Sequence, residues 1–132
     1  MGKRYLIDTN AIIDYTSGLF PNKGLSFVDD IINQEVNISV ISKIEALAFE
    51  PQADKQKQYF QLLIDFISNA NVYMLDDFII EKTIEIRKAF KLKLPDAIIA
   101  ATSVNNNLTL ISRDVKDFGK VPKLKIINPY EL

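Results

Sequence analysis

The chain has 132 residues, of which 48% are hydrophobic and 25% charged, and its formal net charge is −1. This length and composition predict a soluble globular protein with one domain, residues 1–132, that can bury a sufficient core. The sequence contains no cysteine and no histidine, which excludes disulfides, thiolate nucleophiles, imidazole bases and metal sites built on sulfur or imidazole.

The pattern of apolar residues gives no sign of a membrane segment. Charged or amide residues interrupt every apolar run before it reaches the roughly 20 residues that span a bilayer. The apolar residues between Arg4 and Asp8 are too few for a signal peptide. We therefore expect a cytoplasmic protein.

The first predicted element is a buried strand that begins at Tyr5 and ends at Asp8, before a short helix over 10–15. An acidic residue at the end of a strand lies where open α/β sheets bind their ligands. Aspartate is also common at the N-terminus of a helix, where it accepts a hydrogen bond from a free backbone N–H. For Asp8 alone both interpretations stand.

Residues 16–24 read as a loop, and 25–34 as a helix whose Asp29 and Asp30 face solvent without a role. A second strand is predicted over 36–41. Glu45 follows it, within the spacing Ser-x-x-Glu that is typical of a capping box. The spacing alone favours capping over a role in a site.

A strongly amphipathic helix is predicted over 54–68, a third strand over 72–75 and a helix from Phe78 to about Phe90, capped by Asp76 or Asp77. Pro95 then begins a further helix, which is apolar on most sides and should be buried. Asp96 lies in its first turn. A carboxylate on a buried helix is unfavourable unless something pairs with it, which favours a functional role over a helix-dipole role.

A fourth strand is predicted over 108–111, and the segment 112–118 after it contains Asp114 and Asp117. Turn chemistry is the alternative explanation, because aspartate readily bonds its own following backbone. A short edge strand over 124–127 completes the predicted sheet.

Alternating strands and helices without a hairpin signal predict an α/β fold of three layers, α/β/α, with a central, mostly parallel twisted sheet of four to five strands. Right-handed crossovers bring the carboxyl ends of the strands to one edge. Asp8, Glu45, Asp96 and Asp114 can then reach one crevice. A single shared site accounts for the positions of all four acids. The alternatives, namely helix capping, a helix-dipole role and turn chemistry, require a separate explanation for each acid.

Clustered carboxylates repel one another, and divalent cations relieve this repulsion. An all-oxygen site without histidine or cysteine suits Mg²⁺ or Mn²⁺. Two such ions, about 3.5–4 Å apart, clamp the displacement at phosphorus in phosphodiester hydrolysis. The acids therefore favour nuclease chemistry.

The distribution of basic residues is compatible with a nucleic-acid substrate. Ten of the 16 Lys and Arg residues lie within 82–132. A metal-loaded form could attract phosphates through them, although the basic residues by themselves favour a solvated face.

Taken in order, these motifs resemble a PIN-domain protein, and within that family most closely a VapC-type toxin of a type II toxin–antitoxin system. The resemblance covers residue 4 to about 129 and rests on segments 8–10, 42–47, 94–101, 112–118 and 127–129. Ser112 stands where threonine is more usual, and Asp114 where many members carry asparagine.

The resemblance implies a metal-dependent endoribonuclease of RNA that uses Mg²⁺ or Mn²⁺. It implies metal binding by Asp8, Glu45, Asp96 and Asp114, a supporting acid at Asp117, and polar support from Asn10 and Ser112. It also implies a homodimer that is inhibited by a small antitoxin protein. The large apolar side chains around the loop over 16–24 suggest a groove for such a partner: Tyr15, Leu19, Phe20, Leu25 and Phe27.

Two other functions are compatible with an aspartate after the first strand. A non-catalytic PIN-like binding or adaptor module would share the fold, but a degenerate member should have lost acids that this chain retains. A phosphotransferase with an aspartyl-phosphate intermediate is disfavoured, because its usual Asp-x-Asp-x-Thr pattern is interrupted by Asn10.

Overall fold

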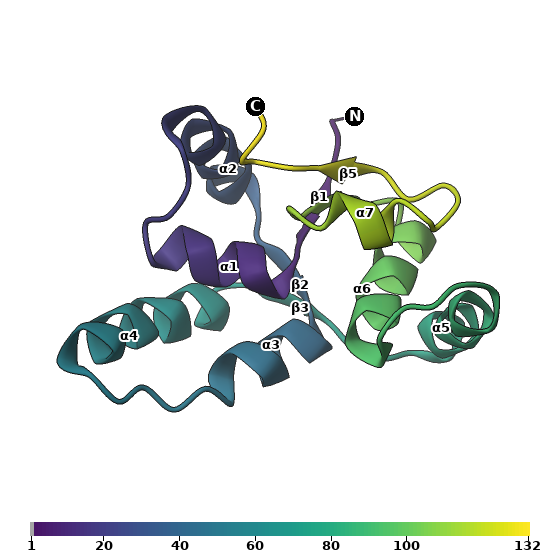
Figure 1. The fold of residues 1–132 in the computed structure, drawn as a ribbon, viewed down its shortest axis with the longest axis horizontal. Helices are drawn as coiled ribbons and strands as arrows, with labels where there is room; N and C mark the ends of the chain where they lie inside the picture. Colours follow the sequence, from purple (N-terminus) through teal and green to yellow (C-terminus); the bar gives the residue numbers. More distant parts are fainter. Residues whose placement is uncertain (1) are drawn as a thin grey trace.

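The computed structural model describes residues 2–132, in which two helices follow each of the strands β1, β2 and β3 (Figure 1). In this range no helix is both long and apolar enough to cross a membrane. The elements are β1 Tyr5–Ile7, α1 Thr9–Thr16, α2 Asn22–Gln34, β2 Asn37–Ser39, α3 Val40–Leu47, α4 Asp54–Ser68, β3 Asn71–Tyr73, α5 Asp77–Ala89, α6 Leu94–Asn105, β4 Thr109–Ile111, α7 Val115–Phe118 and β5 Ile126–Ile127.

All paired strands are parallel, as predicted, but their backbone hydrogen bonds form two sheets rather than one. β1, β4 and β5 make a three-stranded sheet with β4 in the middle, and β2 pairs with β3. β2 lies beside β1, on the side that β4 leaves free. The resulting strand order is β3-β2-β1-β4-β5.

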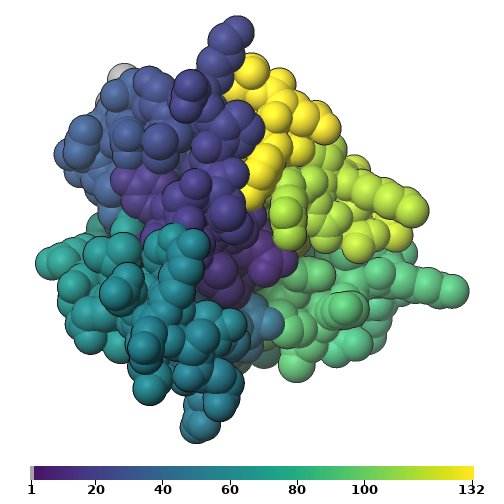
Figure 2. Space-filling view, turned by 60° about the vertical axis from the view of Figure 1, so that its left-hand side comes forward, coloured from purple at the N-terminus to yellow at the C-terminus, as the bar shows by residue number. Residues whose placement is uncertain are grey.

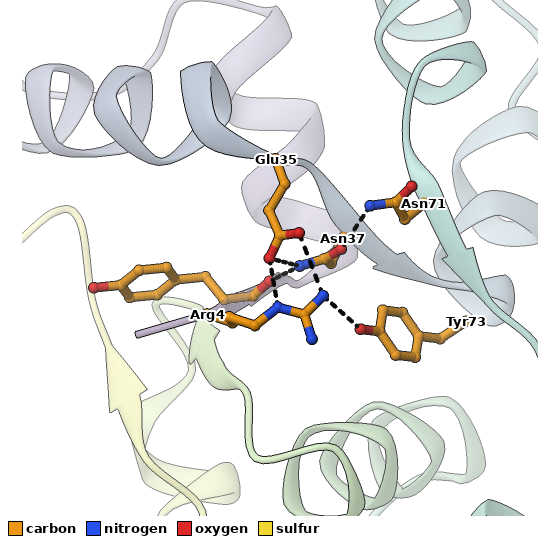
Figure 3. A network of polar contacts seen from close by, with 6 residues as sticks. Arg4, Glu35, Asn37, Asn71 and Tyr73 are labelled. Carbon is orange, nitrogen blue, oxygen red and sulfur yellow. Dashed lines mark hydrogen bonds and ion pairs between the residues drawn. The ribbon is translucent and has the colours of Figure 1, made fainter. Parts of the chain in front are cut away.

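Side chains bridge the seam between β1 and β2, as Figure 3 shows. Asn37 Nδ2 donates to the carbonyl oxygen of Tyr5 at 2.9 Å, and Asn37 Oδ1 accepts from Asn71 Nδ2 at 3.1 Å. Next to them, Arg4 Nε donates to Glu35 Oε1 at 2.7 Å. One buried asparagine thus links three strands where the backbone ladder is interrupted.

The sheet has a hydrophobic core on each face. Leu6 and Leu110 pack with α5 and α6 on one side, whereas Ile7 and Ile111 pack with α1, α2 and α4 on the other. Neighbouring residues of a strand point to opposite faces, so β1 and β4 each contribute to both cores. Figure 1 shows the same three layers, with α1, α2 and α4 left of the strands and α5 and α6 right of them. The predicted α/β/α architecture is confirmed.

Two predicted helices agree closely with the structure. α4 covers the predicted residues 54–68, and α6 is buried along its length from Ala97 to Ser103. Asp76 caps α5 by accepting a hydrogen bond from the Ile79 N–H at 2.8 Å. The third strand is shorter than predicted, and α2 begins at Asn22 rather than Leu25.

Two local predictions are wrong, and one short helix was not predicted. Val40 and Ile41 belong to α3 rather than to β2, because the Ser39 hydroxyl caps the helix by accepting from the Ile41 N–H. Asp29 does not simply face solvent, since it accepts a hydrogen bond from the Tyr15 hydroxyl at 2.6 Å. The segment after β4 contains a short helix, α7, that was not predicted.

Gly24 marks the contact between α2 and the C-terminal tail. A Cβ atom built on it would lie 1.9 Å from the Pro129 carbonyl oxygen. We therefore expect Gly24→Ala to lower the free energy of unfolding by about 1–3 kcal/mol, the usual range for overpacking, although alanine is the better helix former. Urea denaturation measures this change. Gly2→Ala is the control, because nothing lies within 4 Å of a Cβ at that position.

Candidate metal site at the carboxyl edge of the sheet

Asp8 directly follows β1 and is 6% exposed. It occupies the N-cap position of α1, yet its side chain makes no capping hydrogen bond. Instead its Oδ2 atom accepts a hydrogen bond from the Ser112 hydroxyl at 2.7 Å. The helix-capping interpretation of Asp8 is therefore wrong, and its carboxylate belongs to a contact between β1 and the segment after β4.

Ser112 is fully buried and connects two of the predicted site residues. Its Oγ atom donates to Asp8 and accepts from the Asp114 N–H at 3.0 Å. Ser112 therefore fixes the turn that carries Asp114 relative to the buried carboxylate.

Asp114 combines turn chemistry with a position at the site. It is the N-cap residue of α7, and its Oδ1 atom accepts from the Asp117 N–H at 3.2 Å. The predicted alternative, a hydrogen bond between the side chain and the backbone that follows it, therefore applies to the Oδ1 atom. A carboxylate offers about four lone-pair positions, so this capping bond leaves capacity for a second partner.

Glu45 is not a capping residue, because α3 begins at Val40 and the Glu45 side chain contacts α1 instead. Thr9 Oγ1 lies 2.9 Å from Glu45 Oε1 and 2.8 Å from Ser42 Oγ. The Thr9 hydroxyl has one proton and the carboxylate has none, so Thr9 donates to Glu45 and can accept from Ser42. This contact brings the end of β1 and the helix after β2 to the same edge.

Asp96 lies in the first turn of α6 and is half-buried. Burial raises its pKa, and the negative charges of Asp114 and Glu45 raise it further, while the positive charge of Lys93 opposes them. Carboxylates that follow two different strands, β2 and β4, thus raise the pKa of the one on α6.

Burial also raises the pKa of Asp8, to about 6. The hydrogen bond from Ser112 opposes the shift, whereas the charges of Asp96 and Asp114 add to it. A buried carboxylate among other carboxylates is unfavourable when it is ionised, and a nearby cation would relieve this.

The two other predicted residues lie at the periphery. Asp117 forms an ion pair with Lys120, with 3.4 Å between Oδ1 and Nζ, and its charge also raises the pKa of Asp96. Asn10 is exposed on α1, and within the described chain its side chain forms no hydrogen bond with another residue.

The acids do not form a ready-made coordination shell. Within residues 2–132, no three acidic side chains lie close enough together to hold one metal ion. The donor set nevertheless suits a hard divalent cation, because all candidate ligands are carboxylate oxygens and one of them is buried with a raised pKa. Figure 2 shows the start of the chain, in purple, beside blue, green and yellow-green segments, which are the colours of α3, α6 and the segment after β4.

Thr9 and Ser42 are missing from the predicted site, although both contact it. Ser42 and Glu45 are three residues apart and therefore share one face of α3, which is the available sequence signal. Thr9 is adjacent to Asp8, but a sequence pattern does not reveal its contact with a residue 36 positions away.

We expect Thr9→Val to weaken Mn²⁺ binding at this site about 10- to 100-fold, the usual effect of losing a group that orients a metal ligand. Valine has nearly the same shape but cannot donate to Glu45. Calorimetric titration with Mn²⁺ measures the effect. Thr9→Ser retains the hydroxyl and is expected to bind like the wild type; wild-type affinity of Thr9→Val as well would show that this contact is dispensable.

The fold and the acidic edge together define an α/β protein with an all-oxygen candidate metal site. The model of the PIN domain matches residues 5–124. The chain belongs to the PIN domain family, as its motifs indicated.

Solved structures agree with this assignment. A toxin–antitoxin complex from Klebsiella pneumoniae contains a chain with 30% identity and a TM-score of 0.72, where the match covers 97% of this chain and 99% of that one. The match to DNA-bound VapBC from Salmonella typhimurium has 18% identity, the same coverage and a TM-score of 0.81. FitAcB from Neisseria gonorrhoeae matches with 23% identity, again 97% and 99% coverage, and a TM-score of 0.72. No curated protein matches the sequence.

Proposed function

We propose that this PIN-domain protein is a VapC-type toxin, a Mg²⁺- or Mn²⁺-dependent endoribonuclease. The observation that carries the proposal is the buried Asp8 carboxylate at the end of β1, whose pKa is raised to about 6 by burial and by neighbouring acids. A buried acid whose pKa is raised by burial and by other acids is typical of a functional site.

The proposed ligands are the carboxylates of Asp8, Glu45, Asp96 and Asp114. A bound divalent ion supplies an activated water and charge stabilisation at phosphorus. The protein's own residues position these ligands: Ser112 holds Asp8 and the Asp114 turn, and Thr9 holds Glu45. Lys93 is exposed beside Asp96 and places a positive charge where an RNA phosphate would approach.

RNA cleavage by the purified protein tests this function. We expect cleavage of RNA with Mg²⁺ or Mn²⁺, none with EDTA, and recovery when the metal is added back. A protein that binds RNA but cuts none under any of these conditions would instead be the adaptor module that the sequence left open.

The structure changes part of the groove predicted for the antitoxin around the loop before α2. Phe20 is buried against Tyr15 and Tyr130, so it is not available to a partner, whereas Leu19 is 60% exposed. Tyr15 and Leu25 line a hollow of about 460 Å³ beside α4, so this place stays a prediction.

We favour a second groove with a more apolar lining, which lies between α1, α3 and α4. It has a volume of about 370 Å³ and an apolar lining that includes Ile13, Phe49, Phe60 and Leu63, and Glu45 lies at its border. An amphipathic segment fits such a groove.

Phe49 is half exposed, so Phe49→Asp tests whether the antitoxin docks in this groove. The variant should no longer copurify with the proposed antitoxin but should keep its ribonuclease activity. If Phe49→Asp copurifies with the antitoxin as well as the wild-type protein does, this groove is not the docking site.

The homodimer is likewise a proposal. Ile80 and Ile84 are exposed apolar residues four positions apart, hence on one face of α5, and Met74 and Phe78 are exposed nearby in the sequence. Light scattering tests whether this surface pairs two copies. Ile80→Glu combined with Ile84→Glu should convert a dimer into a monomer.

A further inference from the structure

The C-terminal tail contacts the helix that follows Asp8. Asp14 on α1 is a buried carboxylate, 7% exposed, and its Oδ2 atom accepts a hydrogen bond from the Tyr130 hydroxyl. The Tyr130 ring also packs edge-on against Phe20, with 5.3 Å between ring centroids. The tail therefore has both a polar and an apolar anchor.

Arg113 reaches the same carboxylate from the segment after β4. Its Nη1 atom lies 3.7 Å from Asp14 Oδ2, and its guanidinium carbon lies 5.7 Å from the centroid of the Tyr130 ring. Arg113 stands between Ser112 and Asp114, the two residues whose hydrogen bond fixes the turn beside Asp8. One buried carboxylate thus joins α1, the tail and the turn that carries a proposed metal ligand.

Physical chemistry favours a lasting contact of these three groups. A buried carboxylate is unfavourable unless it is paired and hydrogen-bonded. Burial and the bond to Asp14 raise the pKa of Tyr130 to about 12, so its phenol stays protonated and donates at neutral pH. Stacking on Tyr130 restricts the guanidinium, which is otherwise half exposed.

We propose that Asp14, Tyr130 and Arg113 form a latch that positions the Ser112–Asp114 turn at the metal site. Arg113 and Tyr130 are positioning residues in this account, and no contact of theirs with the reacting atoms is required. The effect of the latch on metal binding rests on the proposed function. The effect of the latch on the Ser112–Asp114 turn does not depend on that function.

The chain provides a matched control for the Tyr130 hydrogen bond. Tyr15 donates to Asp29 at 2.6 Å, and burial and this bond raise its pKa to about 12 as well. This second pair joins α1 to α2 and has no contact with the Ser112–Asp114 turn. Tyr15→Phe therefore removes the same kind of bond at a place where the latch is not affected.

The test combines Mn²⁺ titration with amide hydrogen exchange of the metal-free protein. Tyr130→Phe should weaken Mn²⁺ binding about tenfold, as loss of an outer-shell partner typically does. It should also speed exchange of the Asp114 N–H relative to that of Leu110 in β4, whose N–H is bonded to Lys125. Tyr15→Phe should leave both quantities at the wild-type value.

Asp14→Asn serves as a second variant, because asparagine still accepts from Tyr130 but loses the charge that faces Arg113. It should change Mn²⁺ binding and Asp114 exchange in the same direction. Equal behaviour of Tyr130→Phe and Tyr15→Phe in both measurements would overturn the latch. If the wild-type protein binds no Mn²⁺, even with RNA present, the proposed function fails, and the exchange of Asp114 alone then decides whether the latch exists.

Discussion

Asp8→Asn is expected to abolish RNA cleavage while leaving the fold intact. Asparagine can still accept the hydrogen bond from Ser112, so the contact between β1 and the segment after β4 is retained. Its neutral oxygen is, however, a poor ligand for a hard divalent ion. We expect a loss of at least about 100-fold, comparable to the loss of one electrostatic contact to a transition state.

Single-turnover cleavage of a labelled RNA with Mg²⁺ or Mn²⁺ measures this loss. Asp30→Asn is the matched control, since Asp30 is an exposed aspartate on α2 outside the site, and it should cleave at the wild-type rate. Wild-type activity of Asp8→Asn would contradict the assignment of this carboxylate.

The same carboxylate should make the metal-free protein less stable at neutral pH than at pH 4. The pKa of Asp8 is about 6 in the folded chain and 3.8 for an ordinary aspartate. Between these values the folded state binds more protons than the unfolded state, so stability falls as the pH rises and levels off above about pH 6. Two pKa units correspond to a change on the order of 3 kcal/mol.

Urea denaturation in EDTA at several pH values between 4 and 7 checks this. Asp8→Asn lacks the titrating group, so its free energy of unfolding at pH 7 should equal or exceed that of the wild type. Its free energy of unfolding should also fall less than that of the wild type as the pH rises from 4 to 6. The difference between the two proteins removes the contribution of carboxyl groups outside the site. Asp96, whose pKa is raised in the same sense, loses the repulsion of Asp8 in this variant and therefore adds to the difference in the same direction. Parallel profiles for both proteins would show that Asp8 carries no such penalty.

Much of the fold follows from periodic patterns in the sequence. α4 was predicted with its observed bounds because apolar residues recur along it at helical spacing. Val40 and Ile41 were misplaced because a β-branched run does not reveal where a strand ends and a helix begins. The Ser39 cap decides that boundary. The seam between β1 and β2 was not predictable, because it depends on the Asn37 side chain bonding to Tyr5.

The order of the acids along the chain was readable, but their contacts were not. Ser112 and Asp8 are 104 positions apart, and only the fold brings them together. For Glu45 the local pattern favoured capping, and the tertiary contact with Thr9 decided otherwise. Asp114 shows that both interpretations can apply at once, since it caps α7 and also raises the pKa of Asp8.

The central claim is that carboxylates from separate elements act as one metal site. Calorimetric titration of the wild-type protein and Asp96→Asn with Mg²⁺ and Mn²⁺ tests it most directly, because Asp96 lies on α6 rather than after a strand. We expect the wild-type protein to bind and Asp96→Asn to lose binding while keeping its fold. Binding of equal affinity by both proteins, with or without RNA, would contradict the claim.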